Sequence, residues 1–291
     1  MSCKSWPKSD SNCSAKRLPE GWAAMSSFSP RAQRHMASKF AHAMRSAELA
    51  LAMPMLPVGG KILELGAGDG WQASILTQHG FKVTAIDVQG IAAGATQYTP
   101  VTIYDGQTIP FPDASFDAIY SSNVLEHIKD FDRIQAELAR VLTPNGVAVH
   151  CLPSATWRFW TTVGHPFHAA KWVCASRNRA TPPVDPSRTP NINRHLVDKN
   201  ILDLVRLGLV APRHGEHGNL LTEHYLFTRS AWKRRFQRTQ WQVEDIRPTE
   251  LFYSGNELFG LRLTPRFRES MAGILGSSTF LLKSCPPRAR T

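Results

Sequence analysis

The stretch Lys61-Ile-Leu-Glu-Leu-Gly-Ala-Gly-Asp-Gly70 decides the fold of this chain. The apolar run Lys61–Leu65 predicts a buried strand, and the glycine-rich loop after it opens a helix predicted over 70–78. Glycine lets the backbone come close to a ligand, and the N-terminus of a helix presents free N–H groups. We therefore expect a strand, a ligand-binding loop and a helix, which together form the first unit of an α/β fold.

Further strand and helix signals alternate on the C-terminal side of this stretch. Predicted strands cover 81–87, 101–104, 116–121 and 147–152, and a predicted helix covers 128–142. A helix at 229–238, a strand at 241–246, a helix at 266–275 and a strand at 279–283 complete the pattern. Alternation of this kind is typical of a parallel sheet with helices on both faces. The sequence predicts a Rossmann-like sheet of seven mostly parallel strands.

The segments around this pattern divide the chain into five parts. Residues 1–19 are a predicted disordered lead-in, and 20–57 are a helical segment whose helix, over 29–53, would lie against the core or over the site. Residues 58–152 form the ligand-binding core. Residues 153–220, rich in aromatic residues and proline, form an insertion or lid, and 221–291 complete the sheet and carry an apolar loop.

The composition is that of an ordinary globular protein, with 42% hydrophobic and 20% charged residues. The longest apolar stretch, 49–58, is interrupted by two prolines and is shorter than the roughly 20 residues that span a bilayer. Five scattered cysteines without a C-x-x-C pair favour a reducing cytoplasm.

The charged residues are unevenly distributed along the chain. Residues 61–152 carry 5 basic and 10 acidic side chains, whereas residues 153–291 carry 21 basic and 10 acidic side chains. The excess of basic residues outside 61–152 indicates either an anionic partner or a solvated surface.

Two acidic residues follow predicted strands at positions that indicate a nucleoside ligand. Asp87 lies about 20 residues beyond the glycines, where a carboxylate accepts hydrogen bonds from ribose hydroxyls. Asp105 follows the next strand, beside Gly106. A dinucleotide-binding loop would have its third glycine where Trp71 stands, so the loop is not typical of an NAD or FAD site.

Together these features resemble class I S-adenosylmethionine-dependent methyltransferases, densely over 61–152. The resemblance implies S-adenosylmethionine as the cofactor, with its methionine part against the glycine loop and its amino group held by Glu64. Asp87 would bind the ribose, and Asp105 would face the adenine amino group. The residues expected to contact the cofactor are Glu64, Gly66, Ala67, Gly68, Asp87, Val88, Asp105, Gly106, Ser122 and Asn123.

Three further motifs match the same family: Ile109-Pro-Phe-Pro-Asp113, Ser115-Phe-Asp117 and Ser121-Ser-Asn-Val-Leu-Glu-His127. The last of them is similar to members that methylate small molecules, including quinone precursors. It differs from the Asn-Pro-Pro-Tyr signature of amino-directed nucleic-acid enzymes. The tail over 252–278 resembles bacterial methyltransferases that accompany polysaccharide or lipid-linked sugar synthesis.

Methyl transfer from a sulfonium needs alignment and exclusion of water, and a hydroxyl acceptor also needs a general base. His127 is the first candidate because it follows the fourth strand; alternatively, it caps the next helix or packs on the cofactor. His165 and His168 are further candidates, or surface histidines. No third ligand accompanies this pair at a recognisable spacing, so no metal site is expected. Glu223 and His224 begin a predicted helix and either face the crevice or cap that helix.

Five aromatic residues between Trp157 and Trp172 predict a wall for an apolar acceptor, a membrane-contacting surface or a lid packed on the sheet. The leading hypothesis is a methyltransferase that acts on an oxygen of a small, partly apolar acceptor such as a lipid-linked saccharide or a prenylated aromatic. It would work in the cytoplasm, with peripheral contact to the anionic inner membrane face. RNA methylation and a non-catalytic binding protein of the same fold are the alternatives, and no RNA-binding motif supports the former.

Overall fold

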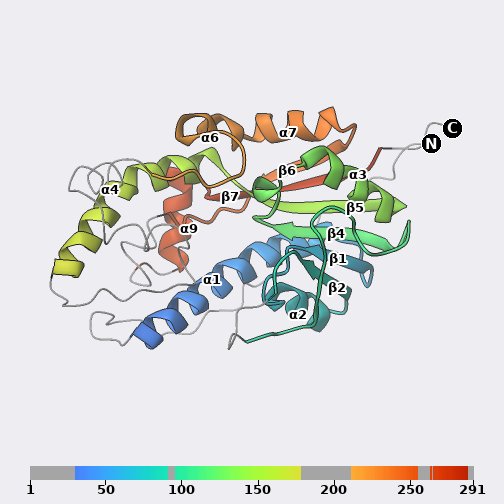
Figure 1. The fold of residues 1–291 in the computed structure, drawn as a ribbon, viewed down its shortest axis with the longest axis horizontal. Coiled ribbons are helices and arrows are strands. Elements are labelled where there is room, and N and C mark those ends of the chain that lie inside the picture. Colours follow the sequence, from blue (N-terminus) through green and yellow to red (C-terminus); the bar gives the residue numbers. More distant parts are fainter. Residues whose placement is uncertain (1–29, 91–95, 178–210, 255–262, 264, 288–291) are drawn as a thin grey trace.

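A seven-stranded sheet organises the protein in the computed structural model, which describes residues 30–90, 96–177, 211–254, 263 and 265–287 (Figure 1). The strands lie in the order β3-β2-β1-β4-β5-β7-β6. They are β1 (Lys61–Leu65), β2 (Lys82–Asp87), β3 (Val101–Ile103), β4 (Phe116–Ser122), β5 (Leu142–Pro153), β6 (Gln242–Pro248) and β7 (Thr279–Cys285). Strands β1 to β5 pair in parallel, and β7 is antiparallel to both β5 and β6. The predicted mostly parallel, Rossmann-like sheet is confirmed.

Helices cover both faces of this sheet, with α3 and α7 on one side and α1 and α2 on the other (Figure 1). The helices are α1 (Pro30–Ala52), α2 (Trp71–Gln78), α3 (Phe131–Val141), α4 (Ala155–Arg177), α6 (Leu220–Leu226), α7 (Arg229–Arg238) and α9 (Pro265–Leu275). Along β4, Ile119 packs in the core on the α3 side, whereas Ala118 and Tyr120 pack in the core on the α1 side. Burial on both faces explains why the strands read as continuous apolar runs.

The helix predicted over 128–142 begins later, at Phe131. Asp130 is its N-cap residue, and the Asp130 side chain accepts a hydrogen bond from the Arg133 N–H at 3.1 Å. The preceding residues Leu125–His127 form a separate 3₁₀ turn, η2. The apolar periodicity therefore placed the start of the helix too early, and the capping aspartate marks where it begins.

Strand β5 also differs from its prediction, because it starts before the predicted turn at 144–146. Leu142 pairs with Phe116, and Val147 pairs with Ala118, so the turn residues form a bulge inside the strand. The helix predicted to begin at Glu223 starts three residues earlier, at Leu220, and the remaining predicted strands and helices have ends within two residues of those observed.

Helix α4, directly after β5, is a helix that the aromatic and proline-rich pattern did not reveal. It extends away from the sheet, as Figure 1 shows, and includes Pro166. The predicted lead-in over 1–19 and the part of the predicted insertion over 178–210 lie outside the described residues. Within the ranges described, none of the helices combines the length and the apolar character needed to cross a bilayer.

Candidate functional site

Two adjoining cavities lie where the carboxyl ends of β1, β2 and β4 meet. Their volumes are about 520 and about 860 Å³, and both are lined by Gly66, Asp87, Gln89 and Ser122. Ligands bind at this edge in open parallel sheets. Of the residues predicted to contact the cofactor, all except Glu64 line one or both cavities.

The glycine loop after β1 forms part of the wall of the smaller cavity. Gly66 and Gly68 have φ angles of +73° and +57°, in the left-handed region that glycine adopts without strain. A Cβ atom on Gly66 would collide with Val124, whereas one on Gly68 would meet no atom within 4 Å. The backbone of Gly68 therefore faces open space, where a ligand can approach it closely.

Asp87, the last residue of β2, holds this loop in place. Its Oδ2 accepts a hydrogen bond from the Gly68 N–H at 2.8 Å, and its Oδ1 accepts one from the Gln89 N–H at 3.1 Å. Each carboxylate oxygen has a second lone pair, and Asp87 lines both cavities. A fixed carboxylate with free acceptor capacity fits a vicinal diol such as that of a ribose.

Asp105 and Val88 give the larger cavity a polar and an apolar wall. Asp105 Oδ1 accepts hydrogen bonds from the N–H groups of Thr108 at 2.7 Å and Gln107 at 2.8 Å, and these bonds lower the pKa of the carboxyl. The side chain of Val88 is apolar yet the residue is 51% exposed, and Gly106 lies beside it. An apolar surface beside a charged acceptor suits a purine ring that carries an amino group.

Glu64 is buried at 2% exposure and lines neither cavity. Burial raises the pKa of its carboxyl to about 8, although a hydrogen bond from the Ala73 N–H opposes this effect. Its Oε2 has no hydrogen-bond partner. An unpartnered carboxylate oxygen at the start of the glycine loop fits a cationic amino group that reaches it directly or through water.

Helix α1 supplies cavity residues that the sequence pattern did not single out. Arg45 and His42 both line the smaller cavity. Arg45 Nη1 donates to Ser122 Oγ at 2.8 Å and to Glu48 Oε2 at 2.9 Å. The buried Glu48 accepts in turn from Thr279 Oγ1 at 2.6 Å through its other oxygen, Oε1. The helix thus lies against the core and at the site, and only the fold brings Arg45 to Ser122.

Trp71, the residue that argues against a dinucleotide loop, packs in an aromatic cluster between α1 and the glycine loop. His42 stacks on Trp71 with their ring centroids 4.2 Å apart, and Tyr98 meets both rings edge-on. His42 Nε2 lies 3.3 Å from Asp69 Oδ2. The large side chain at this position therefore fixes α1 to the first turn of α2.

Among the three predicted catalytic histidines, His127 lies at the cavities. It lies in η2, directly after β4, and lines the larger cavity, and partial burial lowers the pKa of its ring. Asp130 caps the next helix, so His127 does not have that role. His165 lies on α4 and is absent from the described lining of both cavities, while the side chain of His168 lies outside the described residues. The geometry favours His127 as the base.

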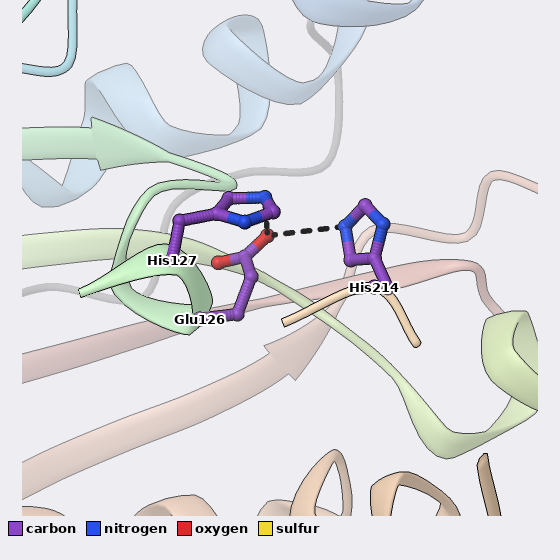
Figure 2. Close-up of side chains that lie close together, drawn as sticks. All are labelled: Glu126, His127 and His214. Atoms are coloured by element: carbon purple, nitrogen blue, oxygen red, sulfur yellow. Dashed lines mark ion pairs between the residues drawn. The ribbon is translucent and has the colours of Figure 1, made fainter. Parts of the chain in front are cut away.

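A cluster that the sequence did not predict adjoins His127. Nε2 of His127 lies 3.9 Å and Nε2 of His214 lies 3.8 Å from Glu126 Oε1, and Figure 2 shows both rings directed at the same carboxylate. The centroids of the two imidazole rings are 4.8 Å apart. His214 follows Glu126 by 88 positions, so no sequence spacing connects them.

Glu223 lines neither cavity, so it does not face the crevice, but it lies in the first turn of α6, where an acidic side chain favours a helix. It is fully buried and forms an ion pair with Arg158 of α4 at 2.9 Å. Its Oε1 accepts hydrogen bonds from the N–H groups of His214 at 2.7 Å and Gly215 at 2.8 Å. Asn219 is the N-cap residue of α6. Glu223 therefore orders the segment that carries His214.

Comparison with known proteins identifies the class to which this fold and site belong. The model of a methyltransferase domain family matches residues 32–246, and the chain belongs to that family. Demethylmenaquinone methyltransferase of Corynebacterium efficiens is 41% identical over 93 residues, which are 31% of this chain and 40% of that protein. An uncharacterised methyltransferase of Mycobacterium bovis is 31% identical over 141 residues, which are 45% of this chain and 68% of that protein.

A similar solved structure is that of an S-adenosylmethionine-dependent methyltransferase from Mesorhizobium loti. It has a TM-score of 0.45 and 20% identity, and the match covers 82% of this chain and 97% of that one. Family membership confirms the predicted resemblance, and S-adenosylmethionine is the cofactor of this class. The match spans only 40% of the demethylmenaquinone enzyme and 32% of 2-methyl-6-phytyl-1,4-hydroquinone methyltransferase of Synechocystis, another relative.

Proposed function

We propose that this protein transfers the methyl group of S-adenosylmethionine to an oxygen atom of a small, partly apolar acceptor. One observation carries the proposal: Asp87, Asp105 and His127 line the same cavity of about 860 Å³. Expected cofactor contacts and a candidate base therefore share one space. The names of two relatives, both quinone-type methyltransferases, support a small and partly apolar acceptor, whereas the oxygen atom rests on His127 as the candidate base.

In this proposal, different residues at the sheet edge bind different parts of the cofactor. Asp87 accepts hydrogen bonds from the ribose hydroxyls, and Asp105 faces the adenine amino group beside Val88. The methionine part approaches the open side of Gly68, and its amino group is held by the unpartnered oxygen of Glu64. The support is the free acceptor capacity of the carboxylates and the open space at the glycine.

When it is bound, the cofactor supplies a methyl group on a sulfonium cation. The protein must align the acceptor, keep water out and take the proton of the hydroxyl. His127 can accept that proton at neutral pH because partial burial lowers its pKa and keeps its ring uncharged. General bases contribute about 10²–10⁴-fold to such reactions.

An exposed apolar surface beside the core supports an acceptor with a lipid or prenyl part. Phe159, Val163 and Phe167 are 49%, 42% and 66% exposed and follow each other at four-residue intervals along α4, on one helix face. Leu221 and Tyr225 of α6 are 79% and 58% exposed. This surface suits shallow contact with the anionic inner face of a membrane from the cytoplasm.

A transfer assay with radiolabelled S-adenosylmethionine tests the proposal. The purified protein is incubated separately with lipid, small-metabolite and RNA fractions of a bacterial lysate. We expect label in the lipid or small-metabolite fraction. Label confined to RNA would replace the proposed acceptor with a nucleic acid, and failure to bind the cofactor in calorimetry would leave a non-catalytic protein of the same fold.

A further inference from the structure

We propose that Glu126, His127 and His214 bind a divalent transition-metal ion of the Zn²⁺, Co²⁺ or Fe²⁺ class at the wall of the larger cavity. Each residue offers one ligand atom, and these atoms all lie within 4.8 Å of one another. Figure 2 shows dashed lines from both imidazole rings that end on the same oxygen of Glu126. The sequence predicted no metal site because the ligands come from two segments far apart in the chain.

The buried carboxylate of Glu126 is the main evidence for a bound cation. Glu126 is 2% exposed, and neither of its side-chain oxygens has a hydrogen-bond partner. Burial of polar oxygens without hydrogen bonds is unfavourable, so such groups are normally hydrogen-bonded or coordinate a metal. The two histidine nitrogens at 3.8 and 3.9 Å are too far away for hydrogen bonds. A cation between the three residues would compensate the charge.

The distances between the ligand atoms are longer than those around a bound ion. A metal with bonds of about 2.0–2.2 Å to nitrogen and oxygen ligands separates neighbouring ligand atoms by roughly 3.4 Å when the geometry is tetrahedral. The two nitrogen-to-oxygen distances of 3.8 and 3.9 Å exceed this value only slightly. The three ligand atoms as a group spread over up to 4.8 Å, so the side chains must move closer together around the ion.

The segment that carries His214 is held in place independently of any metal. The Glu216 N–H donates to the Glu126 carbonyl oxygen at 2.9 Å, and a Cβ on Gly215 would lie 2.8 Å from the same oxygen. The two segments therefore touch backbone to backbone. The ring of His214 also packs edge-on against Trp157, with centroids 4.5 Å apart. Such support from outside the ligand set is typical of metal sites.

The ligand types favour the stated class of metal. Two imidazoles and one carboxylate suit borderline first-row ions, whereas Mg²⁺ and Ca²⁺ prefer oxygen ligands throughout. Three protein ligands leave at least one coordination position free, and His127 lines the larger cavity. An acceptor hydroxyl bound there would have a lower pKa and would release its proton to solvent, so His127 would act as a ligand instead of the base. This last role rests on the proposed function, but metal binding does not.

Metal titration of the chelator-treated full chain tests the site. Zn²⁺ alone is titrated by calorimetry, and Co²⁺ alone by its visible absorption, which reports nitrogen and oxygen coordination. We expect one equivalent to bind in both. Glu126→Gln and His214→Ala should each weaken binding at least about 10- to 100-fold. His79→Ala is the matched control, since His79 is an exposed histidine after α2 and should leave affinity unchanged.

Circular dichroism verifies that each variant is folded, and Glu126→Gln preserves side-chain size if His214→Ala does not fold. The site is refuted if the wild-type chain binds neither ion, or if Glu126→Gln binds both ions as tightly as wild type. Calorimetry with S-adenosylmethionine on the same samples separates the two proposals. Cofactor binding without metal binding overturns the metal site alone, and metal binding without cofactor binding overturns the proposed function alone.

Discussion

Arg158 of α4 and Glu223 of α6 form an ion pair at 2.9 Å in which both side chains are almost wholly buried, with residue exposures of 1% and 0%. Glu223 also accepts the backbone N–H groups of His214 and Gly215, and Arg158 Nη2 donates to the Pro212 carbonyl at 2.9 Å. One buried pair thus connects two helices and the loop that reaches the cavity wall.

Arg158→Met should lower the free energy of unfolding by about 3–5 kcal/mol, because it leaves the charge of Glu223 buried without its partner. Denaturant titration measures the loss. The control is Arg238→Met, which removes an ion pair with Asp132 at 2.6 Å whose side chains are 63% and 59% exposed. An exposed pair of this kind contributes about 0–1 kcal/mol. Equal losses in the two variants would contradict the role assigned to burial.

Asp87→Ala should weaken S-adenosylmethionine binding by about 10- to 150-fold, since hydrogen bonds to a charged acceptor contribute roughly 1.5–3 kcal/mol. Calorimetry gives the affinity. Asp113→Ala is the control, because the side chain of Asp113 is 78% exposed and Asp113 lines neither cavity. Unchanged affinity in Asp87→Ala would refute the placement of the ribose.

Gly68→Ala should impair cofactor binding more than folding. Gly68 and Gly59 have φ angles of +57° and +67°, and a Cβ on either would meet no atom within 4 Å. Alanine at each position carries the same backbone strain, of about 1–2 kcal/mol. Only the methyl group on Gly68 would enter the space assigned to the cofactor. Thermal unfolding should therefore shift alike in both variants, whereas calorimetry should show weaker binding only in Gly68→Ala.

Cofactor binding should release protons at pH 7. Burial raises the pKa of Glu64 to about 8, so its carboxyl is mostly protonated in the free protein. Pairing with the ammonium group of the cofactor lowers that pKa and expels the proton. Titrations in buffers of different ionisation enthalpy measure the number released. Glu64→Gln should reduce it to the background value, and a wild-type value of zero would argue against the pairing.

The stability of the protein should fall as the pH rises through the range in which Glu64 titrates. The folded pKa of Glu64, about 8, lies above the ordinary value of 4.5, so the folded state binds more protons between these values. The free energy of unfolding therefore decreases with rising pH in this window, by at most about 1.4 kcal/mol per pH unit from this carboxyl. Denaturant titrations at pH 5, 6, 7 and 8 should show a steeper decrease in the wild type than in Glu64→Gln.

Local signals made most of the sheet edge predictable. The loop from Gly66 to Gly68 follows β1, Asp87 is the last residue of β2, and Asp105 lies two residues after β3. Parallel strands bring their carboxyl ends to one edge of the sheet. Asp130 is a good N-cap residue and marks the start of α3, but the apolar side chain of Ile128 extends the helical periodicity to an earlier position.

Other features depend on tertiary contacts, for which the local sequence carries no signal. Arg45 reaches Ser122 from 77 positions away, and His214 meets Glu126 through a loop that Glu223 orders. Helix α4 was missed because its aromatic residues lie on several faces and Pro166 interrupts the helical pattern. Acceptor specificity depends on segments such as α4 and the loop of His214 more than on the glycine loop that the family shares.

The contact between Glu48 and Thr279 has a consequence for synthesis of the chain on the ribosome. The carboxylate that orients Arg45 accepts its hydrogen bond from a residue 231 positions later. In a nascent chain the glycine loop and Asp87 are therefore synthesised long before Glu48 has its hydrogen-bond donor on β7. The residues expected to touch the cofactor are translated in the first half of the chain, whereas the hydrogen bond from Thr279 to Glu48 forms only after β7 has been made.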